Sequence, residues 1–143
     1  MQKVKVKIKK LQEDAKIPMH ATEGSAGFDF YSVEEKEIKP GETAKVSTGI
    51  AVEIPQGHCI QLWGRSGLEV KGVHKLAGLG DSDYRGEYWI VLRNSSKEPY
   101  KIEKHDRIAQ GVLLPVFQAD FEEVSELSET VRGEGGFHST GKK

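Results

Sequence analysis

The sequence predicts an all-β protein, a barrel or sandwich of short strands. Apolar-rich runs recur along the 143-residue chain, and turn-forming clusters such as Pro40-Gly41 and Asn94-Ser95-Ser96 separate them. No window keeps a helical period for three turns, and a turn or two of helix is expected only near Ser66–Lys71. A chain of this length suits one domain with a sizeable core.

Strands are expected wherever an apolar run lies between turn signals. In chain order they are Val4–Ile8, Phe28–Tyr31, Ala44–Ile50, Ala51–Ile54, Cys59–Trp63, Tyr88–Leu92 and Ile108–Val116. The first alternates apolar residues with lysines, which is the period of a strand. The last two are almost continuously apolar, so we expect a second sheet and another subunit to cover their faces, although a single sandwich also explains the pattern.

The composition narrows the classes of function. The formal net charge is −1 with 30% charged residues, so no global field draws the chain to nucleic acid or to a membrane surface. No apolar run approaches the roughly 20 residues of a membrane span, and the lysine-rich start does not resemble a signal peptide. Cys59 is the only cysteine, which fits a reducing compartment. We expect a cytoplasmic protein.

The segment Gly78–Gly86 carries the strongest indication of a binding site. It contains two aspartates, a tyrosine and an arginine, has glycines at both ends, and leads directly into the apolar run Tyr88–Leu92. Reactive side chains are therefore held at the mouth of a rigid strand, where glycines allow a ligand to approach the backbone closely.

The arginines indicate an anion. The chain has five, and three of them adjoin glycines, in Gly64-Arg65-Ser66-Gly67, Arg85-Gly86 and Arg132-Gly133. A guanidinium binds phosphate or carboxylate through two parallel hydrogen bonds, which lysine cannot do. Each arginine alone suits an ordinary surface or ion-pair position, but together they favour an anion site.

The chain changes character from about Glu122. Glutamates and glycines replace the apolar runs, and the end of the chain contains a lone Phe137 among glycines, between Arg132 and the hydroxyl residues Ser139 and Thr140. A frayed terminus is one interpretation. The combination of arginine, phenylalanine and hydroxyl residues favours another, an arm that becomes ordered over a ligand.

Five segments, in this order, carry a resemblance to a known family: Ala26–Ser32, Gly64–Leu68, Gly78–Gly86, Asp106–Gln110 and Arg132–Gly141. They are similar to the motifs of the trimeric dUTPases. The resemblance implies a β jelly roll over residues 1–125 and a glycine-rich C-terminal arm, 126–143, that closes over an active site. It also implies a homotrimer with sites at subunit boundaries that hydrolyses dUTP to dUMP and pyrophosphate. That reaction keeps uracil out of DNA and supplies dUMP for thymidylate synthesis.

The resemblance gives the hairpin its roles. Asp81 matches the aspartate that activates the water attacking the α-phosphorus, and Asp83 is expected to be a turn or ion-pair residue. Tyr84 corresponds to the residue that packs against the deoxyribose. Uracil is read in this family mainly by backbone groups, which here would be those of Ala77, Gly78, Leu79 and Gly80.

The other motifs would surround the phosphates. Arg65, Ser66 and Gly67 match the motif that holds the α- and β-phosphates, and Gln110 matches a further phosphate contact. Asp29 and Arg107 would support the site, with a local ion pair as an equal alternative. The arm residues are Arg132, Phe137 as a stacking lid, His138, Ser139 and Thr140. Mg²⁺ is the implied cofactor, held by substrate phosphates and water without a direct protein ligand.

Four positions depart from the family pattern, and one of them is Gly64, which replaces a residue that is commonly proline. Gly80 stands where members usually carry a branched aliphatic residue, and we expect it to loosen the backbone beside Asp81. Lys75 stands where many members have an asparagine that helps to read uracil. His138 replaces a glycine of the arm.

Two other functions share this fold. A dCTP deaminase needs a glutamate for proton transfer where Val91 lies in this chain, which argues against deamination. A nucleotide-binding module without catalysis is the second alternative. The presence of Asp81 together with the complete arm argues against it.

Overall fold

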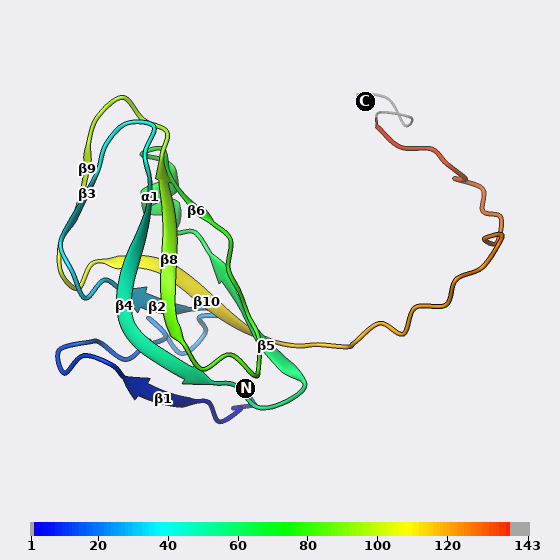
Figure 1. The fold of residues 1–143 in the computed structure, drawn as a ribbon, viewed down its shortest axis with the longest axis horizontal. Helices are drawn as coiled ribbons and strands as arrows, with labels where there is room; N and C mark the ends of the chain where they lie inside the picture. Colours follow the sequence, from blue (N-terminus) through cyan, green and yellow to red (C-terminus); the bar gives the residue numbers. More distant parts are fainter. Residues whose placement is uncertain (1, 138–143) are drawn as a thin grey trace.

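The computed structural model describes residues 2–137, and antiparallel strands dominate it (Figure 1). The first four-stranded sheet has the order β1 (Lys7–Lys10), β4 (Thr43–Glu53), β8 (Glu87–Asn94) and β6 (Val73–Leu76). The second has the order β2 (Phe28–Tyr31), β10 (Arg107–Pro115), β5 (His58–Trp63) and β7 (Leu79–Gly80). A small sheet pairs β3 (Lys36–Ile38) with β9 (Tyr100–Ile102), and α1 (Ser66–Glu69) is the one helix among the described residues. The predicted all-β class is confirmed, and the architecture is that of a jelly roll.

The core lies between the two main sheets. In β8 the side chains of Tyr88, Ile90 and Leu92 are buried, whereas the alternate residues are half-buried or exposed. From the opposite sheet, Phe30 and Ile60 are buried against this face. Full burial of one such side chain contributes about 1.5–3 kcal/mol, so the alternation in β8 fixes which of its faces points inward.

Most predicted strands are confirmed, but two boundaries were wrong. Ala44–Ile50 and Ala51–Ile54 are not separate strands, because β4 continues from Thr43 to Glu53. Its pairing with β8 shifts register between Ser47 and Ala51, and Gly49 there has a φ of +65°. A bulge therefore absorbs the irregularity without ending the strand. The first strand lies later than the predicted Val4–Ile8, at Lys7–Lys10.

Four short strands were not predicted. β3 and β9 are three residues each and contain charged side chains, so their apolar signal is weak. β6 has the mixed sequence Val-His-Lys-Leu, and β7 has only two residues. All four are held by pairing with a partner distant in sequence, which a local pattern does not reveal.

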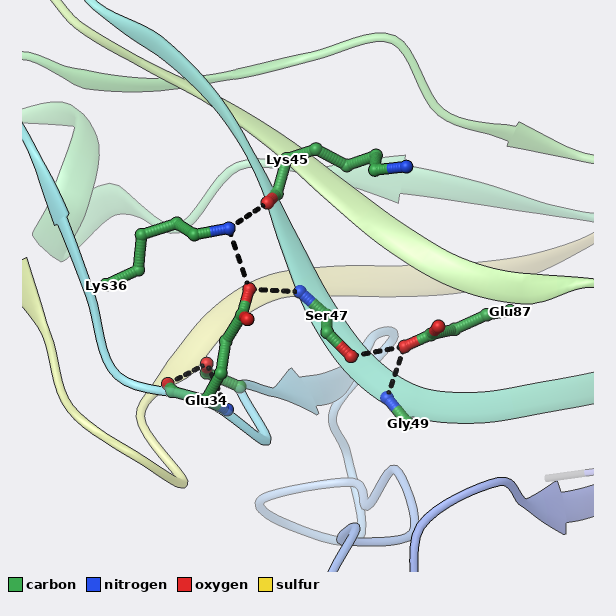
Figure 2. Close-up of polar contacts among 7 residues, drawn as sticks. Glu34, Lys36, Lys45, Ser47, Gly49 and Glu87 are labelled. Carbon is green, nitrogen blue, oxygen red and sulfur yellow. Dashed lines mark hydrogen bonds and ion pairs between the residues drawn. The ribbon is translucent and has the colours of Figure 1, made fainter.

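The β4 bulge is bound by the carboxylate of Glu87, the first residue of β8. Figure 2 shows Glu87 Oε1 accepting hydrogen bonds from the Ser47 hydroxyl and from the Gly49 amide, the latter at 2.8 Å. Removing such an acceptor would leave a part-buried amide without its partner, at a cost of about 1–3 kcal/mol. Glu87 thus fixes the start of β8, directly after the Gly78–Gly86 segment.

A second carboxylate supports the same bulge from the other side. Glu34 Oε1 accepts from the Ser47 amide at 3.0 Å and pairs with Lys36 Nζ at 2.9 Å (Figure 2). Burial opposes ionisation of Glu34, but the Ser47 amide and Lys36 outweigh it, and the pKa of Glu34 is lowered. Lys36 also donates to the Lys45 carbonyl at 2.6 Å, which ties the β3 region to β4.

The chain leaves the sheets after Pro115. Residues 116–137 run away from both main sheets without forming a strand or helix (Figure 1, orange to red). Large apolar side chains along this segment are exposed, namely Phe117, Phe121, Leu127, Val131 and Phe137. Among residues 2–137, no helix has the length and apolar character needed to cross a membrane.

Candidate active site

The hairpin predicted to carry the site crosses from one main sheet to the other. β6 belongs to the first sheet and β7 to the second, and the chain passes between them through Ala77 and Gly78, at φ values of +55° and +126°. The Gly78 carbonyl accepts from the Leu62 amide at 2.8 Å, and a Cβ at position 78 would lie 2.6 Å from Leu62 Cβ. Glycine is therefore required at 78, both for its backbone conformation and for its close packing on β5.

Lys75 holds this crossing in place. Its Nζ donates to the carbonyls of Leu62 and Ala77, both at 2.6 Å. Burial lowers the pKa of Lys75, and the charge of Glu69 partly opposes that shift. The residue that departs from the family pattern thus binds the backbone of the hairpin.

A pocket of about 190 Å³ lies between this hairpin and the start of β8. It is lined by Leu62, Ala77, Gly78, Leu79, Gly80, Tyr84, Glu87, Tyr88 and Trp89. All four residues predicted to read a base through their backbone are among them. Tyr84, 45% exposed, donates from its hydroxyl to the Glu87 carbonyl at 2.9 Å, which fixes its ring at the edge of the pocket.

Asp81 follows directly on this pocket. It is exposed and forms no ion pair within residues 2–137, and its carbonyl accepts from the Tyr84 amide at 3.2 Å. Arg85 donates to the carbonyls of Ser82 and Tyr84 at 2.7 and 3.1 Å. Arg85 therefore stabilises the turn that presents the Asp81 carboxylate.

A second cluster centres on the buried carboxylate of Asp29, which is 4% exposed. Asp29 Oδ1 lies 3.3 Å from Arg65 Nε, and Oδ2 lies 3.6 Å from the Arg107 guanidinium. Arg65 also donates to the Arg107 carbonyl at 3.3 Å. The ion pair considered for Asp29 and Arg107 is thus present. One carboxylate holds two guanidinium groups together, which leaves a net positive site.

Strand register brings Gln110 to the same place. In β10, Gln110 lies opposite Asp29 of β2 on one side and opposite Trp63 of β5 on the other. β5 then leads through Arg65 into α1, where Ser66 and Gly67 form the exposed first turn. The residues predicted to bind or support phosphates therefore gather at one end of the second sheet.

This arginine cluster and Asp81 lie at opposite ends of β5. Gly80 pairs with Ile60, and because β7 runs antiparallel to β5, Asp81 continues away from Arg65. The distance along the chain from Ile60 to Arg65 corresponds to about 16 Å at the rise of an extended strand. Within one chain, the hairpin pocket and the arginine cluster are therefore separated from each other.

The predicted arm residues are only partly described. Arg132 Nε donates to the Gly135 carbonyl at 2.8 Å in a local turn, and Phe137 is fully exposed. Both lie on the segment that runs away from the sheets (Figure 1). His138, Ser139 and Thr140 fall outside the described residues.

The sequence reasoning missed Tyr88 as a site residue. Its ring stacks on Phe30 with centroids 5.5 Å apart, and it also lines the pocket beside Tyr84. Burial raises the pKa of Tyr88 to about 12, with the charge of Asp81 as the next cause. The signal available in the sequence was a hydroxyl-bearing residue at the start of an otherwise apolar strand, directly after the hairpin.

Comparison with known proteins agrees with these motifs. The family model for dUTPase matches residues 13–141. The chain belongs to the dUTPase family. Among its relatives, the deoxyuridine 5'-triphosphate nucleotidohydrolase of Nautilia profundicola is 51% identical over 142 residues, covering 97% of this chain and 100% of that protein. The enzyme of the same name from Clostridioides difficile is 48% identical and covers 95% and 97% of the two chains.

Solved dUTPase structures share the fold. The dUTPase of Staphylococcus bacteriophage 80alpha, solved with dUPNHPP, has a TM-score of 0.90 at 30% identity, covering 96% of this chain and 98% of that one. A point mutant of the dUTPase from phage phi11 of S. aureus, described with a structural Mg(II) ion, has a TM-score of 0.81 at 26% identity, covering 86% and 98%. The predicted family and jelly-roll fold are confirmed, and these comparisons favour a dUTPase over a dCTP deaminase.

Proposed function

We propose that this dUTPase hydrolyses dUTP to dUMP and pyrophosphate, and that it thereby keeps uracil out of DNA and supplies dUMP for thymidylate synthesis. The observation that carries the proposal is the hairpin pocket. Its lining includes the hairpin residues 77–80 and two tyrosines, Tyr84 and Tyr88, and the exposed Asp81 directly follows Gly80 in the chain. A nucleotide whose base enters this pocket would bring its sugar and α-phosphate towards that carboxylate.

Base and sugar are selected by shape and by backbone hydrogen bonds. The amides and carbonyls of residues 77–80 pair with uracil, and the tight crossing at Gly78 leaves little room for a larger base. A mismatched base would leave buried backbone groups unpaired, which makes such discrimination strong. Tyr84, held by its bond to the Glu87 carbonyl, packs on the deoxyribose and fills the space of a 2′-hydroxyl.

Asp81 acts as the general base. It orients and deprotonates the water that attacks the α-phosphorus, while the bond from that phosphorus to the bridging oxygen breaks and pyrophosphate leaves. An aspartate carboxylate is a weak base, so most of its effect comes from holding the water in line. The turn bonds made by Arg85 supply that rigidity.

The arginine cluster holds the phosphates. Arg65, Ser66, Gly67 and Gln110 are the contacts, and the buried Asp29 keeps Arg65 and Arg107 in fixed orientations. A guanidinium that is already held in place loses little freedom when the phosphates bind. Its positive charge then stabilises the negative charge that develops in the transition state.

Mg²⁺ is the proposed cofactor. Asp29 is already paired with two arginines, and the described part of the chain contains no group of three or more side chains suited to a metal. These residues fit an ion that is carried by the substrate phosphates and by water. Such an ion supplies charge neutralisation on the triphosphate.

We propose a homotrimer in which each site combines the hairpin of one subunit with the arginine cluster of another. Two features support this. The hairpin pocket and the arginine cluster lie at opposite ends of β5 in one chain. In addition, a groove of about 780 Å³ lined by residues such as Val6, Ile8, Phe28 and Leu113 suits the exposed apolar side chains of residues 116–137 from another copy. The arm, 126–143, would then close over a site with Arg132, Phe137, His138, Ser139 and Thr140.

Activity is tested by pyrophosphate release from dUTP and dCTP, each with Mg²⁺. We expect release from dUTP alone. Deoxyuridine products from dCTP would favour a deaminase, and tight dUTP binding without turnover would favour a silent binding module. The cytoplasm is the proposed compartment, in keeping with the single cysteine and a free nucleotide substrate.

The shared site is tested by complementation. Asp81→Asn and Arg65→Ala are each expected to be inactive. In every mixed trimer, however, one of the three sites would combine an intact Asp81 from one subunit with an intact Arg65 from its neighbour. Refolding the two variants together should therefore restore about one third of the wild-type rate per mixed trimer. If mixed trimers form and stay inactive, the two residues serve the same subunit's site.

A further inference from the structure

The hydroxyl of Tyr88 is buried directly against Gly80. A Cβ built on residue 80 would overlap the Tyr88 hydroxyl oxygen and lie 2.8 Å from Cζ and 3.0 Å from Cε1. Real Cβ atoms do not make such contacts, so a tyrosine at 88 requires a glycine at 80. Gly80 was expected to loosen the backbone beside Asp81, but the ring of Tyr88 packs directly against it.

The ring itself cannot move away. Tyr88 is 4% exposed and stacks almost parallel on Phe30, with 5° between the two planes. Its backbone carbonyl accepts from the Thr48 hydroxyl at 2.5 Å. Ring and backbone are therefore both fixed, and the position of the hydroxyl is fixed with them.

The hydroxyl is a buried donor without a partner. It makes no hydrogen bond to any atom of residues 2–137, and its solvent exposure is negligible. An unpaired buried hydroxyl costs about 1–3 kcal/mol, whereas phenylalanine would fill nearly the same volume without that cost. Its oxygen touches Gly80, and the Cα of Asp81 is only about 3.8 Å further along the chain.

We propose that Tyr88 is a positioning residue for Asp81. With nucleotide bound, the Tyr88 hydroxyl donates a hydrogen bond to the Asp81 carboxylate and so holds this general base next to the α-phosphate. The proposal rests on the proposed function. The charge of Asp81 already acts on Tyr88 in this structure, since it contributes to the raised pKa of the phenol. Gly80 provides the space through which the hydroxyl reaches the Asp81 segment.

The test is Tyr88→Phe, with Tyr31→Phe as the matched control. Tyr31 lies in β2, away from the hairpin, and its ring faces Lys16. The wild-type enzyme is first assayed for dUTP hydrolysis; if it is inactive, the proposed function fails before this question arises. In an active enzyme we expect Tyr88→Phe to lower kcat about tenfold, the value of one hydrogen bond to a charged group. KM should stay within about twofold, and the acid limb of the pH–rate profile should move to higher pH because the ionised Asp81 loses a donor.

Three results would overturn the proposal. An unchanged kcat and pH profile with a raised melting temperature would show that the hydroxyl only fills space. A rise in KM with constant kcat would make Tyr88 a substrate contact. If Tyr88→Phe does not fold, difluorotyrosine at position 88 replaces it, because fluorination strengthens the donor and preserves the ring. The acid limb should then move to lower pH, and an unmoved limb would refute the role.

Discussion

Replacement of Asp29 by asparagine should weaken both the fold and the phosphate site. Asp29 is 4% exposed and lies 3.3 and 3.6 Å from two guanidinium groups, so the neutral amide would leave two like charges together. Removing one partner of a buried ion pair costs about 3–5 kcal/mol. Because Arg107 is half-exposed and water will screen it, we expect about 2–4 kcal/mol for Asp29→Asn.

The assay is urea unfolding at fixed protein concentration. With a slope of about 1–3 kcal/mol per molar urea, the midpoint should fall by about 1–2 M. Asp120→Asn, on the exposed segment after β10, is the matched control and should leave the midpoint unchanged. In the folded Asp29→Asn protein, KM for dUTP should rise about tenfold or more, since Arg65 loses its orientation. A loss of stability below about 0.5 kcal/mol with normal KM would refute the view that Asp29 organises the cluster.

Three further predictions address the general base Asp81, the C-terminal arm and the buried hydroxyl of Tyr88. Asp81→Asn should keep dUTP binding, measured by calorimetry, and lose most turnover; near-normal turnover would exclude it as the base. Deletion of Gly133–Lys143 should leave a trimer, with a mass by light scattering of three truncated chains, but a much lower rate; a full rate would make the arm dispensable. Burial raises the pKa of Tyr88 to about 12 from about 10, so the unfolded state ionises first as pH rises. The free energy of unfolding should therefore fall by about 2–3 kcal/mol between pH 10 and 12 because of Tyr88. Tyr88→Phe should lack this contribution, so the two proteins' free energies of unfolding are compared across that pH range.

The local pattern of apolar residues was sufficient to predict most of the longer strands. Phe28–Tyr31 and the runs that became β5, β8 and β10 are apolar over most of their length, and their boundaries agree closely with the structure. The bulge in β4 was not predictable in the same way. It depends on Glu87, which is distant in sequence and reaches Ser47 and Gly49 from the neighbouring strand β8.

In the candidate site, too, some features could be predicted from the local sequence and others depend on contacts between distant segments. The motifs predicted a binding hairpin and an anion site, because their residue types are unusual at such spacings; the structure places the hairpin residues around a pocket and Arg65 and Arg107 around Asp29. Arg65 and Arg107 share an ion-pair network around the buried Asp29 because of strand register, which no local pattern gives. Gly80 was interpreted as loose for a related reason: its packing partner, Tyr88, reaches it across the turn and not along the chain.

Hydrolysis of dUTP in ¹⁸O-labelled water tests the central claim most directly. If Asp81 directs water to the α-phosphorus, mass spectrometry should find the label in dUMP and none in pyrophosphate. Label in pyrophosphate, or no labelled product from an intact oligomer supplied with Mg²⁺, would contradict the proposed mechanism.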